Sequence, residues 1–83
     1  MIKIYGWQGC VWCDRAKNLA QANNLPYEYV DIKASAEAAA EFQNKFPNDR
    51  SVPQIEWAGR HVGGYLNFQE EVENTRTYGQ EAL

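Results

Sequence analysis

Two cysteines separated by two residues are the most reactive feature of this sequence. Cys10 and Cys13 are the only cysteines in the chain, and they flank Val11 and Trp12. An i, i+3 spacing on one helical turn brings two Cα atoms within the roughly 4.4–6.8 Å that a disulfide requires. Two such sulfurs can form and break a disulfide without rearranging the chain. The pair therefore predicts thiol–disulfide exchange.

We expect Cys10 to be the nucleophile and Cys13 the resolving thiol. Cys10 stands where a predicted strand turns into a helix, and the free N–H groups and dipole of a helix N-terminus lower a thiol pKa from about 8.5 to about 3.5–7.5. Cys13 lies one turn later on a face with Ala16 and Ala20, where it is less exposed. The alternatives are two buried thiols or part of a zinc site. Because zinc needs four ligands and His61 is the only histidine, we expect no bound metal.

The hydrophobic pattern predicts how the rest of the chain positions these cysteines. It indicates strands at residues 2–5, 27–32, 53–57 and 60–63, and helices at 10–22 and 35–46. We expect Ser35 to cap the second helix and Asn67 to open a last helix that frays near Gly79. The first two strands and their helix form a parallel βαβ unit, and a turn at Ala58 and Gly59 makes the last two strands antiparallel.

Length and composition fit a single domain spanning residues 1–83, because so short a chain can bury only one core. The net charge is -3, and the eight Lys and Arg residues are scattered, which disfavours nucleic acid as a partner. The sequence has no signal-peptide pattern, and no apolar run approaches the roughly 20 residues that span a bilayer. We therefore expect a soluble, cytoplasmic protein that does not bind membranes.

A second signal follows Ser51 and Val52, where Pro53 begins a predicted strand. Proline costs little at the first position of a strand, and an X–Pro bond can adopt the cis form. A loop proline that simply enters an edge strand is the alternative interpretation. His61, in the next predicted strand, is expected at the surface without a catalytic role, and Trp12 is expected to be an exposed contact residue.

Together these residues resemble the glutaredoxins. The resemblance covers nearly the whole chain, in four blocks: residues 2–5, 10–13, 50–55 and 61–64. The short chain and the absence of proline between the cysteines are most similar to the compact dithiol glutaredoxins of bacteriophages and bacteria. The resemblance implies an α/β thioredoxin fold of order βαβαββα, in which three helices flank a four-stranded mixed sheet.

The resemblance also implies a glutathione-dependent thiol–disulfide oxidoreductase. Cys10 would attack protein disulfides and glutathionylated thiols, and glutathione, as co-substrate, would restore the dithiol. The implied partners are glutathione and disulfide-bearing proteins, with ribonucleotide reductase as one candidate, and we expect a monomer. Two alternatives remain: a dimer that holds an iron–sulfur cluster through Cys10 and glutathione thiols, and a reductant supplied by thioredoxin reductase.

The family's glutathione site can be transferred residue by residue. By resemblance, the Val52 backbone pairs with the cysteine of glutathione beside a cis Val52–Pro53 bond, and the glycines at 63 and 64 allow the γ-glutamyl group to approach closely. The expected glutathione-binding residues are Trp12, Arg50, Ser51, Val52, Pro53, Gly64, Tyr65 and Asn67.

Three positions depart from the family pattern. Val11 replaces a common proline, and we expect its N–H to donate to Cys10 Sγ and lower the thiol pKa. Trp7 replaces a lysine three residues before Cys10, and we expect Arg50 to supply a cation instead. Leu66 and Asn67 stand where the family carries acidic residues that receive the amino group of glutathione. The amide of Asn67 would accept that hydrogen bond, or Glu70 or Glu71 would supply the charge, and the alternative is that Asn67 only caps the helix.

Overall fold

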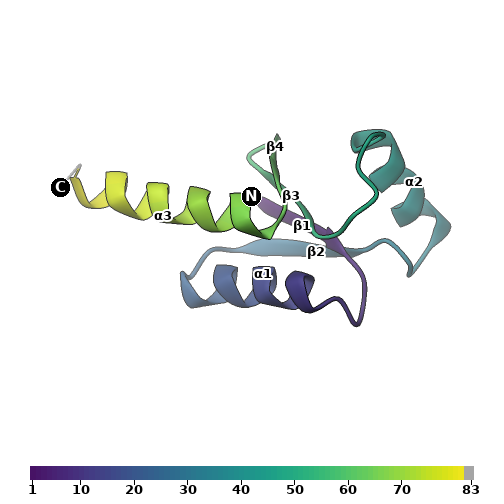
Figure 1. Ribbon diagram of the computed structural model, residues 1–83, viewed down its shortest axis with the longest axis horizontal. Helices are drawn as coiled ribbons and strands as arrows, with labels where there is room; N and C mark the ends of the chain where they lie inside the picture. Colours follow the sequence, from purple (N-terminus) through teal and green to yellow (C-terminus); the bar gives the residue numbers. More distant parts are fainter. Residues whose placement is uncertain (82–83) are drawn as a thin grey trace.

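A computed structural model describes residues 1–81, in which four strands and three helices follow the predicted order (Figure 1). The elements are β1 (Ile2–Gly6), α1 (Val11–Ala22), β2 (Tyr27–Asp31), α2 (Ala36–Lys45), β3 (Gln54–Trp57), β4 (Arg60–Gly63) and α3 (Tyr65–Glu81). The bounds of the four strands and of α1 and α2 differ from the predicted ones by a single residue at most, which is the usual uncertainty of an element's end.

The four strands form one mixed sheet in the order β2-β1-β3-β4. β1 pairs in parallel with β2, and β3 is antiparallel to both β1 and β4. Ile4, in the middle of β1, lies opposite Tyr29 on one side and Ile55 on the other. This is the mixed four-stranded sheet of the thioredoxin fold. β1 is an interior strand of the sheet, and the chain leaves its end to reach the cysteine pair.

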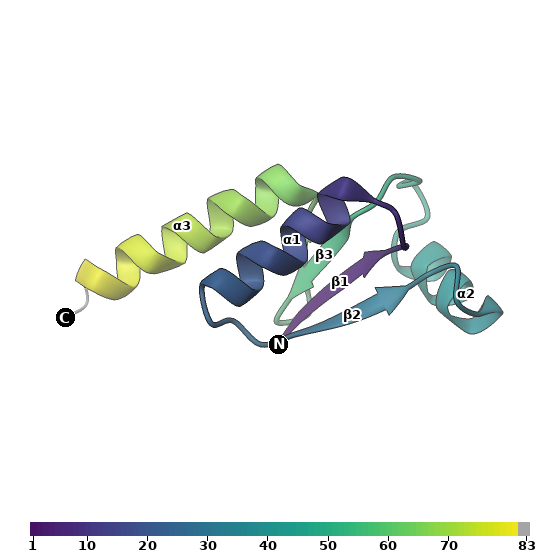
Figure 2. The ribbon, with the colours of Figure 1, turned by 90° about the horizontal axis from the view of Figure 1, so that it is seen from below.

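Alternating side chains of β1 divide the core between the two faces of the sheet. Ile2 and Ile4 pack with residues of α1 and α3 on one face, whereas Tyr5 packs with Phe42 and Phe46 on the face that α2 covers. Figure 2 shows α1 and α3 side by side, whereas α2 lies near the ends toward which the arrows of β1 and β2 point. The period of two along the strand therefore decides which helix each residue meets.

The start of α3 differs from the prediction. The helix begins at Tyr65, and the N–H of Phe68 donates to the carbonyl of Gly64 at 3.0 Å, so Gly64 occupies the N-cap position. Asn67 consequently lies within the first turn and is exposed. A Cβ on Gly63 would lie only 3.0 Å from Asn67 Cγ, so the Asn67 side chain packs against the chain entering the helix instead of capping it.

The far end of α3 also differs, because the helix continues to Glu81 through the predicted end near Gly79. One glycine costs a helix only about 1 kcal/mol relative to alanine, which does not force an end.

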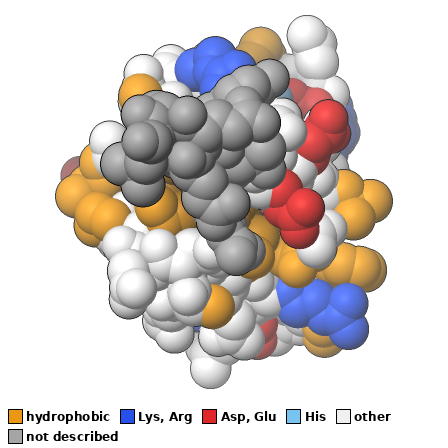
Figure 3. Space-filling model, turned by 90° about the vertical axis from the view of Figure 1, so that its left-hand side faces the viewer, with side chains coloured by type: hydrophobic (Ala, Val, Ile, Leu, Met, Phe, Trp, Pro, Cys, Tyr) orange, Lys and Arg blue, Asp and Glu red, His pale blue; other side chains and the backbone are white. Residues whose placement is uncertain are grey.

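Among the described residues, no helix has both the length and the apolar character needed to cross a bilayer. At the end of the molecule drawn in Figure 3, basic side chains lie in separate places with acidic ones between them.

Candidate active site

Cys10 and Cys13 meet at the start of α1, where they form a disulfide. Cys10 is the N-cap residue, with φ -87° and ψ 111°, and its Cα lies 5.2 Å from that of Cys13. Cys10 is half-buried, whereas Cys13 is fully buried on the face with Ala16 and Ala20. This difference supports the predicted roles, because a substrate disulfide can reach only the outer sulfur.

The N–H that reaches Cys10 Sγ belongs to Cys13 and not to Val11. The Cys13 nitrogen lies 3.1 Å from the sulfur. The expectation for Val11 was wrong because an N-cap side chain reaches the amides of the second and third helical residues, and Val11 is the first. In the reduced protein, the same amide and the helix dipole are positioned to stabilise a Cys10 thiolate.

Gly6, at the end of β1, makes room for the buried sulfur. A Cβ at this position would lie 2.5 Å from Cys13 Sγ and 2.7 Å from the hydroxyl oxygen of Tyr29. That hydroxyl donates a hydrogen bond to the carbonyl of Trp7 at 3.2 Å. Sequence reasoning singled out neither Gly6 nor Tyr29 as a site residue. The available signal was a glycine between a strand and a cysteine pair.

A cavity of about 260 Å³ lies beside Cys10, between the loop before β3 and the start of α3. Val52 lines it, and the carbonyl oxygen of Val52 lies 4.0 Å from Cys10 Sγ. The full lining is Trp12, Ser51, Val52, Pro53, Gly64, Tyr65, Leu66 and Asn67. The structure therefore brings together all the expected glutathione-binding residues except Arg50, and it adds the exposed Leu66.

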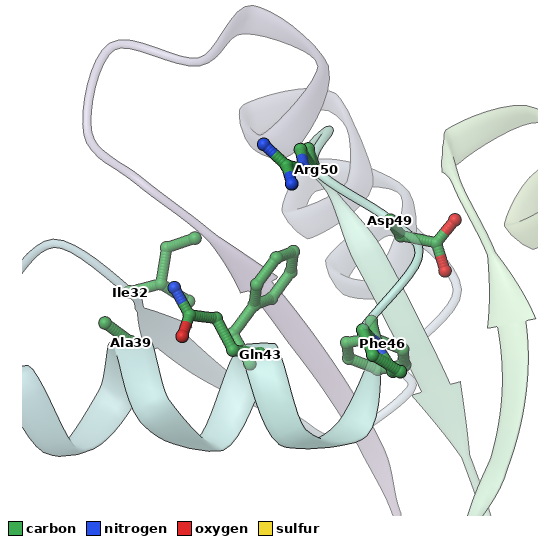
Figure 4. Close-up of a pocket in the computed structure, with 8 residues that line it drawn as sticks. Ile32, Ala39, Gln43, Phe46, Asp49 and Arg50 are labelled. Atoms are coloured by element: carbon green, nitrogen blue, oxygen red, sulfur yellow. The ribbon is translucent and has the colours of Figure 1, made fainter.

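Arg50 lines a different cavity, of about 500 Å³, which opens between α2 and the loop that follows it (Figure 4). Figure 4 shows the guanidinium group of Arg50 on the same side as the Gln43 amide, above Ile32 and Ala39. The other lining residues are Phe42, Phe46, Pro47 and Asp49. Arg50 adjoins Ser51 in the chain, but it lines this second cavity and not the one that Ser51 lines.

A cation accompanies Trp7 although the family's lysine is absent there. The ammonium nitrogen of Lys33, in the turn after β2, lies 4.2 Å from the centre of the Trp7 ring. A cation over the face of an indole is a favourable arrangement. Sequence reasoning assigned the compensating charge to Arg50 and overlooked Lys33, because their separation along the chain gives no sign that Trp7 and Lys33 meet.

The loop before β3 is fixed by a buried glutamine. Gln54 is only 5% exposed. Its amide nitrogen donates to the carbonyl of Ser51 at 3.1 Å and lies 3.4 Å from the Ser51 hydroxyl, while its amide oxygen lies 2.8 Å from Nε2 of His61. The Val52–Pro53 bond is cis, as expected. His61 is exposed, also as expected. Its contact with the amide oxygen of Gln54 nevertheless fixes the side chain that bonds Ser51 in this loop.

Trp12 remains exposed between the cysteines, as predicted. Its side chain is 47% exposed, with the Tyr65 ring centre 5.3 Å away and the guanidinium carbon of Arg15 4.5 Å from its own ring centre. Val11 and Leu66 are exposed apolar residues at 61% and 69%. Trp12 therefore forms one wall of the cavity beside Cys10, with apolar surface near its mouth.

Comparison with known sequences agrees with this geometry. The sequence model of the family described as Glutaredoxin matches residues 2–62. Glutaredoxin 1 of Escherichia coli (strain K12) is 38% identical over 71 residues, which cover 78% of this chain and 84% of the relative. The glutaredoxin of Enterobacteria phage T4 is 31% identical over 84 residues, which cover 84% of this chain and 97% of the phage protein.

Solved structures have the same fold. The structure of reduced Escherichia coli glutaredoxin is similar with a TM-score of 0.76 and 34% identity, covering 92% of this chain and 96% of that one. The buckwheat glutaredoxin–glutathione complex gives a TM-score of 0.78 at 20% identity, covering 88% of this chain and 68% of that one, and supports the fold. With a Cys10–Cys13 pair at disulfide distance in this fold, the chain belongs to the glutaredoxin family of thiol–disulfide oxidoreductases.

Proposed function

We propose that this protein is a glutathione-dependent reductase of protein disulfides and glutathionylated thiols that works as a monomer in the cytoplasm. The observation that carries the proposal is the cavity of about 260 Å³ beside Cys10. Its walls combine Val52, the small Gly64 and the aromatic residues Trp12 and Tyr65. A peptide with a central cysteine can extend along such a surface while its sulfur faces Cys10.

In this proposal, a glutathionylated protein needs only Cys10. The Cys10 thiolate attacks the glutathione sulfur, the protein sulfur leaves and takes up a proton, and a Cys10–glutathione disulfide forms. A second glutathione, as the thiolate, then attacks the glutathione sulfur of this disulfide. The products are glutathione disulfide and the Cys10 thiolate, so one free glutathione is consumed and the other half of the glutathione disulfide comes from the substrate.

A protein disulfide uses both cysteines in the proposal. Cys10 attacks one sulfur of the substrate, and the other substrate sulfur leaves as a thiol. Cys13 then attacks Cys10, which releases the second substrate thiol and forms the Cys10–Cys13 disulfide. Two glutathione molecules reduce this disulfide and become one glutathione disulfide. The 5.2 Å between the Cα atoms supports the step, because no backbone movement is needed to join the sulfurs.

Two cations and one amide are the proposed charge partners of glutathione. Lys33 lies over Trp7, three residues before Cys10. Arg50 lines the cavity of about 500 Å³ and directly precedes Ser51 in the chain. Both cations would attract the carboxylates of glutathione. The side-chain oxygen of Asn67 would accept a hydrogen bond from the amino group, in place of the family's acidic residue. Because a neutral amide stabilises an ammonium group less than a carboxylate does, we expect weaker glutathione binding than in relatives with an acid there.

An NADPH-coupled assay tests the proposal. Turnover of a glutathionylated peptide is measured with glutathione and glutathione reductase, and in parallel with thioredoxin reductase alone. The proposal expects the glutathione couple to drive turnover, and thioredoxin reductase alone to give none. The reverse result would identify a reductant supplied by thioredoxin reductase. The same assay with oxidised ribonucleotide reductase as substrate tests that protein as a partner.

A further inference from the structure

The burial of Cys13 creates a chemical requirement. The resolving step needs the thiolate of Cys13, because the thiolate and not the thiol attacks a disulfide. Burial in apolar surroundings opposes ionisation of a thiol, and Cys13 is 0% exposed among Ala16, Ala20 and other core residues. A hydrogen bond donated to the sulfur would offset this cost as negative charge develops.

Tyr29 has a hydroxyl group at the buried sulfur. A Cβ on Gly6 would lie 2.5 Å from Cys13 Sγ and 2.7 Å from the Tyr29 hydroxyl oxygen, so these two atoms are separated by at most the sum of those distances. The sheet fixes this arrangement, since Tyr29 pairs with Ile4 in the parallel β1–β2 ladder. Gly6 is thus the gap across which the hydroxyl and the sulfur face each other.

We propose that the Tyr29 hydroxyl donates a hydrogen bond to the Cys13 sulfur during the resolving step. This inference rests on the dithiol route proposed above. The Cys13 thiol loses its proton and its sulfur attacks Cys10 Sγ in the mixed disulfide. The Cys10–Cys13 bond forms, the bond from Cys10 to the substrate sulfur breaks, and the substrate thiolate takes up a proton. Tyr29 keeps its own proton and only redirects it.

In the disulfide form, the Tyr29 hydroxyl donates to the Trp7 carbonyl at 3.2 Å. That carbonyl also accepts from the N–H of Cys10 at 3.4 Å, so it keeps a partner when Tyr29 turns toward the sulfur. Burial, together with the nearby carboxylates of Asp31 and Asp14, raises the pKa of Tyr29 above its usual value. The hydroxyl therefore remains protonated, as a donor must.

The decisive variant is Tyr29→Phe, which keeps the ring and removes the hydroxyl. Tyr27→Phe is a matched control, because Tyr27 lies two residues away on the same face of β2 and packs against the same core cluster. The Tyr27 hydroxyl accepts a hydrogen bond from Gln21. Both variants lose one hydroxyl from one strand, but only Tyr29→Phe loses the one beside Cys13.

We expect Tyr29→Phe to slow reduction of a protein disulfide about tenfold, because a hydrogen bond to the developing thiolate is lost. The Cys10–Cys13 equilibrium with glutathione should change little, because the hydrogen bond acts on the negative charge that develops during the step and the buried Cys13 thiol is neutral before it. Tyr27→Phe should leave both the rate and the equilibrium unchanged. In a Cys13→Ser background, where no resolving thiol exists, Tyr29→Phe should leave deglutathionylation unchanged.

Two results would overturn the inference. An unchanged rate of protein-disulfide reduction in Tyr29→Phe would mean that the hydroxyl does not act on Cys13. An equal loss of deglutathionylation in the Cys13→Ser background would mean that Tyr29 supports the fold or Cys10 instead. Failure of the dithiol route itself looks different: Cys13→Ser alone would then reduce protein disulfides at the wild-type rate.

Discussion

The sulfur of Cys10 lies 4.0 Å from the carbonyl oxygen of Val52, although these residues are 42 positions apart in the chain. The sheet brings them together, because β1 ends beside the beginning of β3, with Tyr5 paired to Gln54. The start of α1 and the loop before β3 therefore meet at one end of the sheet. A substrate sulfur joined to Cys10 would therefore lie near the backbone of Val52.

The two cysteines should differ sharply when replaced. Cys10→Ser removes the accessible sulfur and should abolish all activity, because Cys13 is fully buried. Cys13→Ser should retain deglutathionylation and lose the reduction of protein disulfides, which requires a resolving thiol. Both activities are measured with purified variants in the glutathione-coupled assay. Equal losses in the two variants would refute this division of roles.

Gly6→Ala should destabilise the protein. Its Cβ would lie 2.5 Å from Cys13 Sγ in the buried end of β1, and overpacking of this kind costs typically about 1–3 kcal/mol. Gly64→Ala is the control, because a Cβ there would meet only the Pro53 carbonyl oxygen at 3.8 Å, an ordinary contact. Urea unfolding should show the larger loss for Gly6→Ala and a smaller one for Gly64→Ala, where alanine is only a poorer N-cap than glycine.

The Gly64→Ala protein also tests the cavity, since the added methyl group would project where glutathione is proposed to bind. We expect a raised KM for glutathione with only the small loss of stability that a poorer N-cap brings. An unaltered KM would show that the ligand does not approach Gly64, and a large loss of stability would show that the position is structural.

Local signals in the sequence were enough for most of the fold. Ser35 caps α2 by accepting the N–H of Ala38 at 3.1 Å, and the predicted turn has φ 53° at Ala58 and 80° at Gly59. Each of these features depends on residues a few positions apart. The start of α3 was misplaced because Asn67 resembles a cap locally, whereas packing against Gly63 places it inside the first turn.

The parts of the site that sequence reasoning missed are contacts between different segments of the fold. Lys33 lies over Trp7, Gln54 joins Ser51 to His61, and the Tyr29 hydroxyl faces Cys13 across Gly6. From the sequence alone, His61 had no structural role because its partner, Gln54, lies on the neighbouring strand. Pairings of this kind depend on strand register, which a single sequence does not specify residue by residue.

Glu41, on α2, should make the free energy of unfolding depend on pH. Hydrogen bonds from Lys3 at 2.8 Å and from Tyr5 at 2.5 Å hold the pKa of Glu41 below its usual value. A carboxylate with a lowered folded-state pKa stabilises the protein above its unfolded pKa, and this contribution disappears as the pH falls through the folded value. Because Glu41 is partly exposed, the gain is at most about 1 kcal/mol.

Glu41→Gln should therefore reduce the free energy of unfolding at pH 7, and the difference from wild type should shrink below about pH 4, where the unfolded-state carboxyl is also protonated. Urea unfolding at several pH values measures it. Glu70→Gln, at an exposed position on α3, is the control and should show no such trend. A Glu41→Gln deficit that stayed constant from pH 7 to acid would argue against the ionic origin.

Val11→Pro should leave the pKa of the Cys10 thiol unchanged, because the Cys13 N–H, and not the Val11 N–H, reaches the sulfur. Val11 is the first residue of α1, where proline fits well, and Cys10 already has the extended backbone (φ -87°, ψ 111°) that a following proline requires. Stability should rise by up to ~1 kcal/mol, since proline restricts the unfolded chain. Thiolate absorbance followed against pH, with Val11→Ala as the control that keeps the N–H, measures the first effect, and urea unfolding measures the second. A pKa raised in Val11→Pro but not in Val11→Ala would restore the Val11 amide as the group that activates Cys10.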